Sequence, residues 1–328
     1  MPRYSFIEFF SSCSYMQRFK RMAFPIETDQ DLDQILRDEF ISEFRKGYTT
    51  VQGVCLPDRY EEFAEAIDNF EVRDDDIWIC SFPKTGTTWS QEMIWCIAKD
   101  LDFDAAKVRL SERFPFLEYT VLFDYTDLMS RDPEIKFIKT HLPFDLLPRE
   151  IRTGKKKPKI IYAARNPKDT CVSYYYHCRL MEGYRGDFNN FCRLFLGDKL
   201  SFAPYWDHVL DFWNRRDETN ILFLKYEDMK SDLSAVIEKT TAFLNKTLSN
   251  DQMTALMKHL SFANMKSNPA VNYEDHIKMI KQMKTTDVDG EFMRSGKVNQ
   301  WKGEMSKSVI EQFDKLMNEK FSSQNLLF

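Results

Sequence analysis

The chain has 328 residues, of which 43% are hydrophobic and 30% charged, a composition typical of a folded protein with a sizeable core. Its formal net charge of −5 argues against a nucleic-acid-binding protein, which would normally carry a basic excess. No run approaches the roughly 18 consecutive apolar residues of a transmembrane helix, so we expect no insertion into a membrane.

Residues 1–22 differ from the rest of the chain by carrying four basic residues against one acidic residue. This composition has some similarity to a transit peptide, but a dispensable extension upstream of Met22 is the simpler interpretation. We therefore expect residues 1–22 to be a disordered or dispensable extension and residues 23–328 to form one domain.

The seven cysteines are odd in number and form no CxxC pair. Several of them lie inside apolar runs, where a buried thiol is the usual state. They predict a reducing compartment rather than a disulfide framework or a zinc site, and hence a cytoplasmic protein.

Strand-like apolar segments alternate with helix-like segments along the chain. The predicted strands are 77–82, 135–139, 159–164 and 220–225. The last two have nearly continuous apolar cores, as strands buried on both faces do. Helical spacing of apolar residues predicts helices around 89–101, after Asn166-Pro167, at 233–244 and at 306–319. This alternation predicts a single α/β domain with a central parallel sheet flanked by helices.

The segment Phe82-Pro83-Lys84-Thr85-Gly86-Thr87-Thr88-Trp89 joins the first predicted strand to a helix. Such a loop binds phosphate, because the N-terminus of a helix offers unpaired N–H groups and the positive end of its dipole. In a Walker A loop the lysine follows the last glycine, whereas Lys84 precedes Gly86. The segment therefore predicts a phosphorylated ligand and argues against a P-loop kinase.

Lys139 and His141 come at the end of the second predicted strand, and strand alternation places both on one face. A histidine, with an ordinary pKa of about 6.5, suits general-base catalysis, and a neighbouring lysine would help to keep it uncharged. The alternative is a structural histidine beside an unrelated lysine. The position at a strand end beside a phosphate loop favours catalysis, because parallel sheets bind ligands at the carboxyl ends of their strands.

Arg165 ends the third predicted strand, where its planar guanidinium is suited to a phosphate group. A helix-capping turn with an exposed arginine is the alternative. The segment Arg294-Ser295-Gly296-Lys297 could close over a phosphate or form a solvated loop. No HExxH, zinc-ligand, GxSxG or GxGxxG motif is present, so we expect neither a metal nor a hydrolase or Rossmann dehydrogenase.

Six motifs, taken in order, resemble those of the cytosolic sulfotransferases. The segment from Phe24 to about Arg45, which precedes these motifs, is more similar to insect members of the family than to vertebrate ones. The six motifs are FPKTGTTW, KTHLPFDLLP, YAARNPKDTCVSYYY, FLKYEDM, the segment Ser261–Pro269 and Arg294-Ser295-Gly296. The resemblance covers roughly residues 47–305. It implies a sulfotransferase fold with a P-loop-like loop. The implied reaction transfers a sulfuryl group from 3′-phosphoadenosine 5′-phosphosulfate (PAPS) to a hydroxyl or amine, with 3′-phosphoadenosine 5′-phosphate (PAP) as product.

The resemblance also implies roles for individual residues. His141 would deprotonate the acceptor, Lys84 would stabilise the leaving 5′-phosphate, and Lys139 would steady the sulfuryl oxygens. The donor would be bound by Lys84, Thr85, Gly86, Thr87, Thr88, Trp89, Arg165, Ser173, Tyr226, Leu260, Phe262, Met265, Arg294, Ser295 and Gly296. The acceptor pocket would be lined by Phe82, Lys139, His141, Tyr174 and His177.

Several alternatives stay open at this point. The small-molecule acceptor could be a phenol, a catecholamine, a steroid or a retinoid, and transient sulfation could dehydrate retinol instead of giving a stable ester. A non-catalytic nucleotide-binding protein of the same fold is a further alternative. A homodimer is possible, although Lys307 stands where the dimer motif of the family usually has a valine. The motif would fall on Lys302, Ser306, Lys307 and Glu311.

Overall fold

The computed structural model describes residues 29–40, 47–122, 136–282 and 290–328. The predicted extension 1–22 lies outside these residues. Among the helices within them, none has both the length and the apolar character needed to cross a bilayer.

A parallel four-stranded sheet forms the centre of the fold, in the order β4-β3-β5-β6. Its strands are β3 (Ile77–Ser81), β4 (Phe137–Thr140), β5 (Lys159–Ala164) and β6 (Ile221–Lys225). All four predicted strands are confirmed: β5 has the predicted ends, and the ends of the other three differ by at most two residues. The parallel sheet and its flanking helices confirm the predicted α/β class.

A separate antiparallel hairpin, which the sequence did not predict, pairs β1 (Tyr48–Val51) with β2 (Val54–Pro57). The described α-helices are α1 (Asp29–Glu39), α2 (Tyr60–Asp68), α3 (Thr87–Ala98), α4 (Leu110–Arg113), α5 (Tyr119–Leu122), α6 (Arg149–Arg152), α7 (Pro167–Met181), α8 (Phe188–Leu196), α9 (Tyr205–Trp213), α10 (Tyr226–Ser231), α11 (Leu233–Phe243), α12 (Asn250–His259), α13 (Phe262–Ser267), α14 (Glu274–Gln282), α15 (Trp301–Glu304) and α16 (Lys307–Phe321). Short 3₁₀ helices cover Ala105–Lys107, Phe144–Leu146 and Ser322–Gln324.

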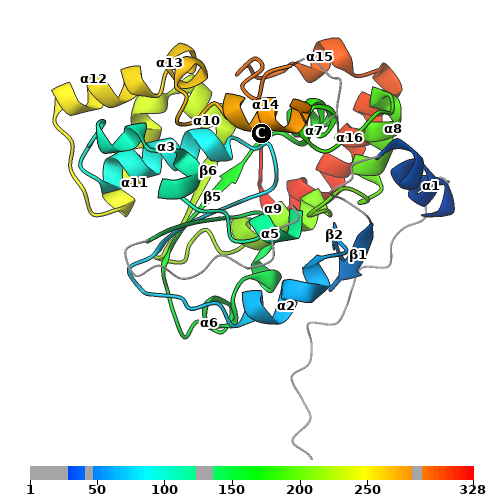
Figure 1. Cartoon of the computed structure of the whole chain (residues 1–328), viewed down its shortest axis with the longest axis horizontal. Helices are drawn as coiled ribbons and strands as arrows, with labels where there is room; N and C mark the ends of the chain where they lie inside the picture. The colour runs from blue at the N-terminus through cyan, green and yellow to red at the C-terminus, as the bar shows by residue number, and fades with distance from the viewer. Residues whose placement is uncertain (1–28, 41–46, 123–135, 283–289) are drawn as a thin grey trace, which may run out of the picture.

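Each face of the sheet carries its own hydrophobic core, because alternate strand residues point to opposite faces. Trp78 and Tyr162 belong to the core that also contains side chains of α7, α8, α9 and α16. Ile79 and Ile161 belong to the other core, with side chains of α3, α11 and α12. Figure 1 shows α3, α11 and α12 on one side of the sheet and α7, α8 and α16 on the other.

The helices that follow β3 and β5 begin at the strand ends for identifiable reasons. At α7, the Asn166 side chain accepts a hydrogen bond from the Lys168 N–H, and Pro167 occupies the first helical position, as predicted. At α3, the preceding residue Gly86 has a φ of 99°, and a Cβ there would lie 2.7 Å from Tyr226 Cδ2. Glycine is therefore required both by the backbone conformation and by the close approach of Tyr226.

Candidate active site

A cavity of about 530 Å³ lies at the carboxyl ends of β3, β4 and β5 and contains most of the predicted site residues. The phosphate loop, Lys139 in β4, His141 directly after β4 and the C-terminal turn are distant in sequence, but all of them reach its wall. The predicted residues that line it are Lys84, Gly86, Thr87, Thr88, Trp89, Lys139, His141, Arg165, Ser173, His177, Tyr226, Leu260, Phe262, Met265, Arg294, Ser295 and Gly296.

Three predicted residues lie elsewhere. Phe82 and Tyr174 are buried in the hydrophobic core, with ring centroids 5.9 Å apart. The hydroxyl of Thr85 is 2.9 Å from the carbonyl oxygen of Phe82 and 2.7 Å from that of Ala163, so its side chain ties the loop to β5. The structure therefore does not place these three side chains on the cavity wall.

The loop between β3 and α3 has the geometry of an anion-binding site. Lys84 and Gly86 both have positive φ, 69° and 99°, which turns the chain sharply before the helix. The helix α3 begins directly after this turn, its first two residues, Thr87 and Thr88, line the cavity, and its N-cap residue Gly86 offers no side-chain cap. Such a turn and a twelve-residue helix together favour a bound phosphate or sulfate group.

His141 is held in one tautomer by its contact with β3. Its Nδ1 lies 2.7 Å from the carbonyl oxygen of Ser81, which can only accept a hydrogen bond, so Nδ1 carries the proton. Nε2 is then the unprotonated nitrogen. Burial, followed by the charge of Lys139, lowers the pKa of His141 well below its usual value, so the ring is neutral near pH 7. The side chain therefore has the proton-accepting form that a general base needs.

Two buried groups that the sequence did not identify fix the backbone of His141. Its N–H donates to the wholly buried carboxylate of Glu118, and its carbonyl accepts a hydrogen bond of 2.8 Å from His208 Nε2. His208 Nδ1 in turn accepts a hydrogen bond of 2.8 Å from the Tyr162 hydroxyl. No local motif marks these residues, because their contacts arise only when β4, β5 and α9 pack together.

Lys84 and Lys139 line the same cavity as His141, and each lies over an aromatic ring. Lys84 Nζ is 4.0 Å from the ring centre of Phe292, and Lys139 Nζ is 3.9 Å from that of Phe116. Burial, reinforced by Lys139 and Arg165, lowers the pKa of Lys84 to about 7, and burial lowers that of Lys139 to about 8. An anion that entered the cavity would restore full charge to both lysines.

Arg165 and Asp169 hold the C-terminal turn over the start of α7. The guanidinium of Arg165 lies 4.3 Å from the ring centre of Tyr226, and its Nη2 donates to the Lys297 carbonyl at 3.0 Å. The carboxylate of Asp169 accepts hydrogen bonds from the N–H groups of residues 299, 300 and 301. Arg294, which also lines the cavity, bonds the Gln300 side chain at 2.5 Å. Two segments more than a hundred residues apart thus form one basic clamp.

An aromatic wall of Trp89, Tyr226 and Phe262 closes the cavity beside this clamp. Trp89 and Tyr226 meet edge to face at 5.6 Å, and the Trp89 indole N–H donates to the Leu260 carbonyl at 2.9 Å. Gly296 has a φ of 62°, and a Cβ there would lie 2.3 Å from Phe262 Cδ2. The wall therefore presents flat apolar surface next to cationic groups, an arrangement that suits a nucleotide.

The rest of the cavity is lined largely by aromatic and apolar residues that sequence reasoning missed. These residues are contributed by segments between the predicted motifs and carry no local signature. They are Phe114, Phe116, Tyr119, Leu180, Met181, Phe202, Tyr273, His276, Phe292 and Met293. This part of the cavity fits a small apolar or aromatic molecule.

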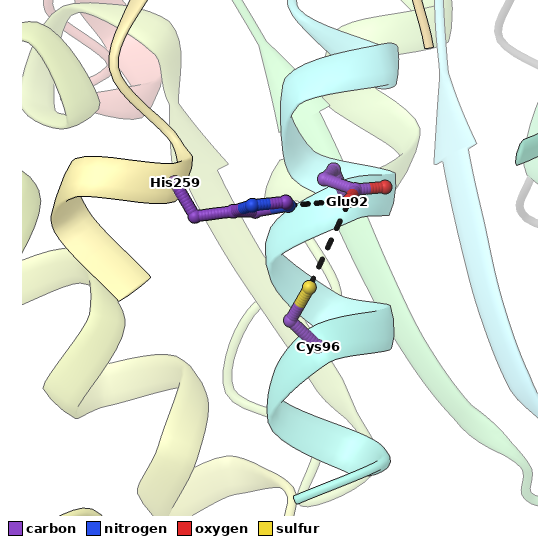
Figure 2. A group of neighbouring side chains, drawn as sticks. All are labelled: Glu92, Cys96 and His259. Atoms are coloured by element: carbon purple, nitrogen blue, oxygen red, sulfur yellow. Dashed lines mark hydrogen bonds and ion pairs between the residues drawn. The ribbon is translucent and has the colours of Figure 1, made fainter. Parts of the chain in front are cut away.

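Outside the cavity, Glu92, Cys96 and His259 bring three possible metal-ligand atoms within 4.8 Å of one another. Figure 2 shows Glu92 and Cys96 on one helix, α3, with His259 reaching toward them from α12. The Glu92 carboxylate is 2.7 Å from both His259 Nε2 and Arg113 Nη2. The buried Arg113 cation opposes a metal ion on the same carboxylate, and burial raises the pKa of the Cys96 thiol. We interpret the group as a polar network that joins α3 to α12.

We expect Arg113→Met to destabilise the protein by about 3–5 kcal/mol, because it would leave the buried Glu92 carboxylate without its cation. Denaturant unfolding monitored by circular dichroism would measure the change. Arg109→Met is the matched control, since the Arg109–Asp275 pair is exposed and should contribute less than about 1 kcal/mol. Equal losses in the two variants would contradict this role for the buried pair.

Comparison with known proteins identifies the family. A family model described as the sulfotransferase domain matches residues 74–324. A luciferin sulfotransferase from Photinus pyralis is 42% identical in an alignment that covers 100% of this chain and 93% of that protein. A solved structure of retinol dehydratase with retinol and PAP superposes with a TM-score of 0.82 and 28% identity, covering 92% of this chain and 98% of that one. Mouse sulfotransferase SULT7A1 with PAP gives a TM-score of 0.65 and 30% identity, covering 83% and 94%. The chain therefore belongs to the sulfotransferase family and is an enzyme of sulfuryl transfer.

Proposed function

We propose that this protein transfers a sulfuryl group from PAPS to a hydroxyl group of a small aromatic or apolar acceptor, with His141 as the general base. The observation that carries this proposal is the tautomer of His141. Its Nδ1–H donates to the Ser81 carbonyl, which leaves Nε2 to accept a proton, and Lys84 and Lys139 line the same cavity. A protein that only bound nucleotides would have no need for this combination.

The residues around the phosphate loop and the clamp fit the two ends of PAPS. Gly86, with its positive φ, opens the loop to a 5′-phosphosulfate at the N-terminus of α3. The Arg165 Nε is buried and has no hydrogen-bond partner among the described residues, although its group is a permanent cation. An anion at this point would satisfy it, and we assign Arg165, Ser173 and Arg294 to the 3′-phosphate. The aromatic wall would pack against the adenine.

PAPS would supply an activated sulfuryl group with PAP as its leaving group. His141 would remove the proton of the acceptor hydroxyl through Nε2 as that oxygen attacks. Lys84 would stabilise the charge that develops on the leaving 5′-phosphate, and Lys139 would steady the oxygens of the transferring sulfuryl group. Cations that are already fixed near the developing charge stabilise the transition state, and they do so most strongly in a buried site from which water is excluded.

A retinol-dehydratase-like reaction is the second candidate, favoured by a specific observation. Two solved structures of retinol dehydratase, one with androsterone and one with retinol, superpose with TM-scores of 0.83 and 0.82. In that reaction a sulfate ester of retinol would form, and loss of its sulfate group together with a proton from the carbon chain would leave a dehydrated hydrocarbon. Chromatography of the product formed from retinol would distinguish a stable sulfate ester from a dehydrated hydrocarbon.

The test of the main proposal is transfer of labelled sulfate from PAPS to a panel of phenols, amines, sterols, retinol and luciferin, the last because of the relative named above. Labelled product with any of these acceptors would support the proposal and identify the acceptor chemistry. Failure to bind PAP in calorimetry, together with no labelled product, would overturn it.

We also propose a cellular location and an oligomeric state for the enzyme. The six cysteines within the described residues are buried and form no disulfide with one another, which supports the proposal of a cytoplasmic location. A homodimer stays a prediction. The predicted dimer segment is exposed where α15 meets α16, and its residues are Lys302, Ser306, Lys307 and Glu311.

A further inference from the structure

Residues 115–118, between α4 and α5, run alongside β4 at the edge of the central sheet. Phe116 forms an isolated parallel bridge with Lys139. The Lys139 N–H donates to the Pro115 carbonyl at 2.8 Å, and the Leu117 N–H donates to the Lys139 carbonyl at 2.9 Å. The backbone of Lys139 is therefore held from both sides by this segment.

A side chain makes the next hydrogen bond of this pairing. In a regular parallel ladder the His141 N–H would donate to the Leu117 carbonyl, but here it donates to the carboxylate of Glu118. Phe116, two residues earlier, lies with its ring centre 3.9 Å from Lys139 Nζ and 5.1 Å from the ring of His141. Two alternate residues of the segment thus contact two alternate residues at the end of β4.

The hydrogen bond to His141 does not explain why residue 118 is charged, because a neutral carbonyl or amide oxygen would also accept it. Glu118 is wholly buried, and a buried carboxylate is costly unless a positive charge compensates it. Its charge acts on Tyr60, Cys80 and Lys139. Burial raises the pKa of Tyr60 to about 12 and that of Cys80 well above its usual value, so both are neutral. Lys139 is the cation of the three.

We propose that Glu118 is a positioning residue of the catalytic site, whose carboxylate fixes the backbone of His141 and supplies the negative charge that stabilises the Lys139 ammonium group. This inference rests on the proposed function, because it assumes that Lys139 acts on the sulfuryl oxygens as a cation. Glu118 does not line the cavity, so it acts through its two neighbours.

The charges of Glu118 and Lys139 support each other, which gives the proposal a pH signature. Burial raises the pKa of Glu118 to about 7, and the charge of Lys139 opposes this rise. Burial lowers the pKa of Lys139, and the charge of Glu118 opposes that fall. Without the carboxylate, Lys139 would lose its proton at a lower pH. Near pH 6 the wild-type carboxyl group is itself protonated, so its removal matters little there and more as the pH rises.

The experiment measures kcat/KM for PAPS between pH 6 and pH 9, with labelled sulfate and the most reactive acceptor of the panel. This parameter reports the ionisations of the free enzyme, and division by the wild-type value at each pH cancels ionisation of the acceptor. Glu118→Gln removes the charge but keeps an oxygen for the His141 N–H. We expect its ratio to lie within about threefold of one at pH 6 and to fall a further tenfold or so by pH 9, which corresponds to a shift of about one unit in the pKa of Lys139.

Two further variants separate the charge of Glu118 from its geometry. Glu118→Asp keeps the charge and shortens the reach to the His141 N–H, so it should lower the rate by a factor that stays constant between pH 7.5 and pH 9. In a Lys139→Arg background the guanidinium stays charged over this range. Adding Glu118→Gln to that background should therefore cause no loss that grows with pH.

Glu227→Gln is the matched control. The half-buried Glu227 carboxylate also accepts a hydrogen bond from a backbone N–H, that of Asn166 at 2.9 Å, but the cation that lowers its pKa is Arg165. An arginine does not titrate in this range, so the ratio for this variant should stay constant between pH 7.5 and pH 9.

The outcomes separate this inference from the proposed function. A ratio for Glu118→Gln that does not change with pH, or a pH-dependent loss that persists in the Lys139→Arg background, would overturn the role of the charge. Thermal unfolding and PAP affinity show whether each variant is folded. If Glu118→Gln does not fold, a loss that grows with pH in Glu118→Asp would overturn the proposal. Absence of both PAP binding and sulfate transfer in the wild type would instead contradict the proposed function.

Discussion

Replacement of His141 by alanine should lower kcat by about a thousandfold while the affinity for PAP changes by no more than about twofold. The physical reason is that Nε2 of His141 is the proton acceptor in the proposed reaction, whereas the nucleotide-binding groups lie on the phosphate loop, the clamp and the aromatic wall. Initial rates at saturating PAPS and acceptor would measure the first effect, and calorimetry with PAP the second.

The control for this prediction is His276→Ala. His276 is another histidine of the cavity wall, and burial lowers its pKa as well, but its ring lies beside that of Tyr119. We expect this variant to lose less than about tenfold in kcat, because it removes a wall group and no proton acceptor. Turnover of His141→Ala at the wild-type rate would rule out the general-base role. A loss of PAP affinity as large as the loss of rate would show that His141 mainly supports the fold of the site.

Replacement of Arg165 by alanine should weaken PAP binding by about a hundredfold, while binding of adenosine 5′-phosphate changes by less than about threefold. Hydrogen bonds to charged groups contribute about 1.5–3 kcal/mol each, and the Arg165 guanidinium is the buried cation of the proposed 3′-phosphate site. The ratio of the two affinities, obtained by competition calorimetry, isolates the 3′-phosphate from the rest of the nucleotide.

Arg165 also donates to the carbonyls of Lys84 and Lys297, so its loss could weaken binding by disturbing the loop and the turn. A second variant separates this structural effect from the loss of a contact with the 3′-phosphate. Arg165→Lys keeps the charge and loses the planar fork, so it should recover only part of the discrimination. Arg215→Ala is the matched control, since Arg215 lies over Phe144, outside the cavity. Parallel losses for both nucleotides in Arg165→Ala would show that the side chain holds the site together without contacting the 3′-phosphate.

The sequence predicted the sheet, and it predicted that residues following the strands meet at one edge of it, because both depend on local patterns. Nearly continuous apolar runs mark buried parallel strands, and polar residues directly after them meet at one edge of the sheet. This reasoning located Lys84, Lys139, His141 and Arg165, and the structure brings all four to one cavity. The hairpin β1–β2 lacked such a pattern, since β1 is partly exposed while β2 is buried throughout.

The acceptor pocket was harder to predict because a shift of one residue reverses the direction of a side chain. Ser81 contacts His141 and Thr87, but the next residue, Phe82, packs in the core. On α7, Ser173 lines the cavity while Tyr174, one position further round the helix, points into the core. Phe116 and Phe292, which do line the cavity, belong to segments that are brought to it only by the tertiary fold. No local sequence pattern predicts such a contact.

The Asp169 carboxylate accepts three hydrogen bonds from the N–H groups of residues 299–301, so the clamp is assembled before any ligand arrives. The conformational entropy of this segment is therefore lost when the chain folds and is not subtracted from the affinity for the nucleotide. Preorganisation of this kind allows a small number of cationic contacts to distinguish strongly between nucleotides with and without a 3′-phosphate. Asp169 itself lines no part of the cavity. A substitution there should nevertheless lower the affinity for the nucleotide, because the segment 299–301 would no longer be held in place before binding.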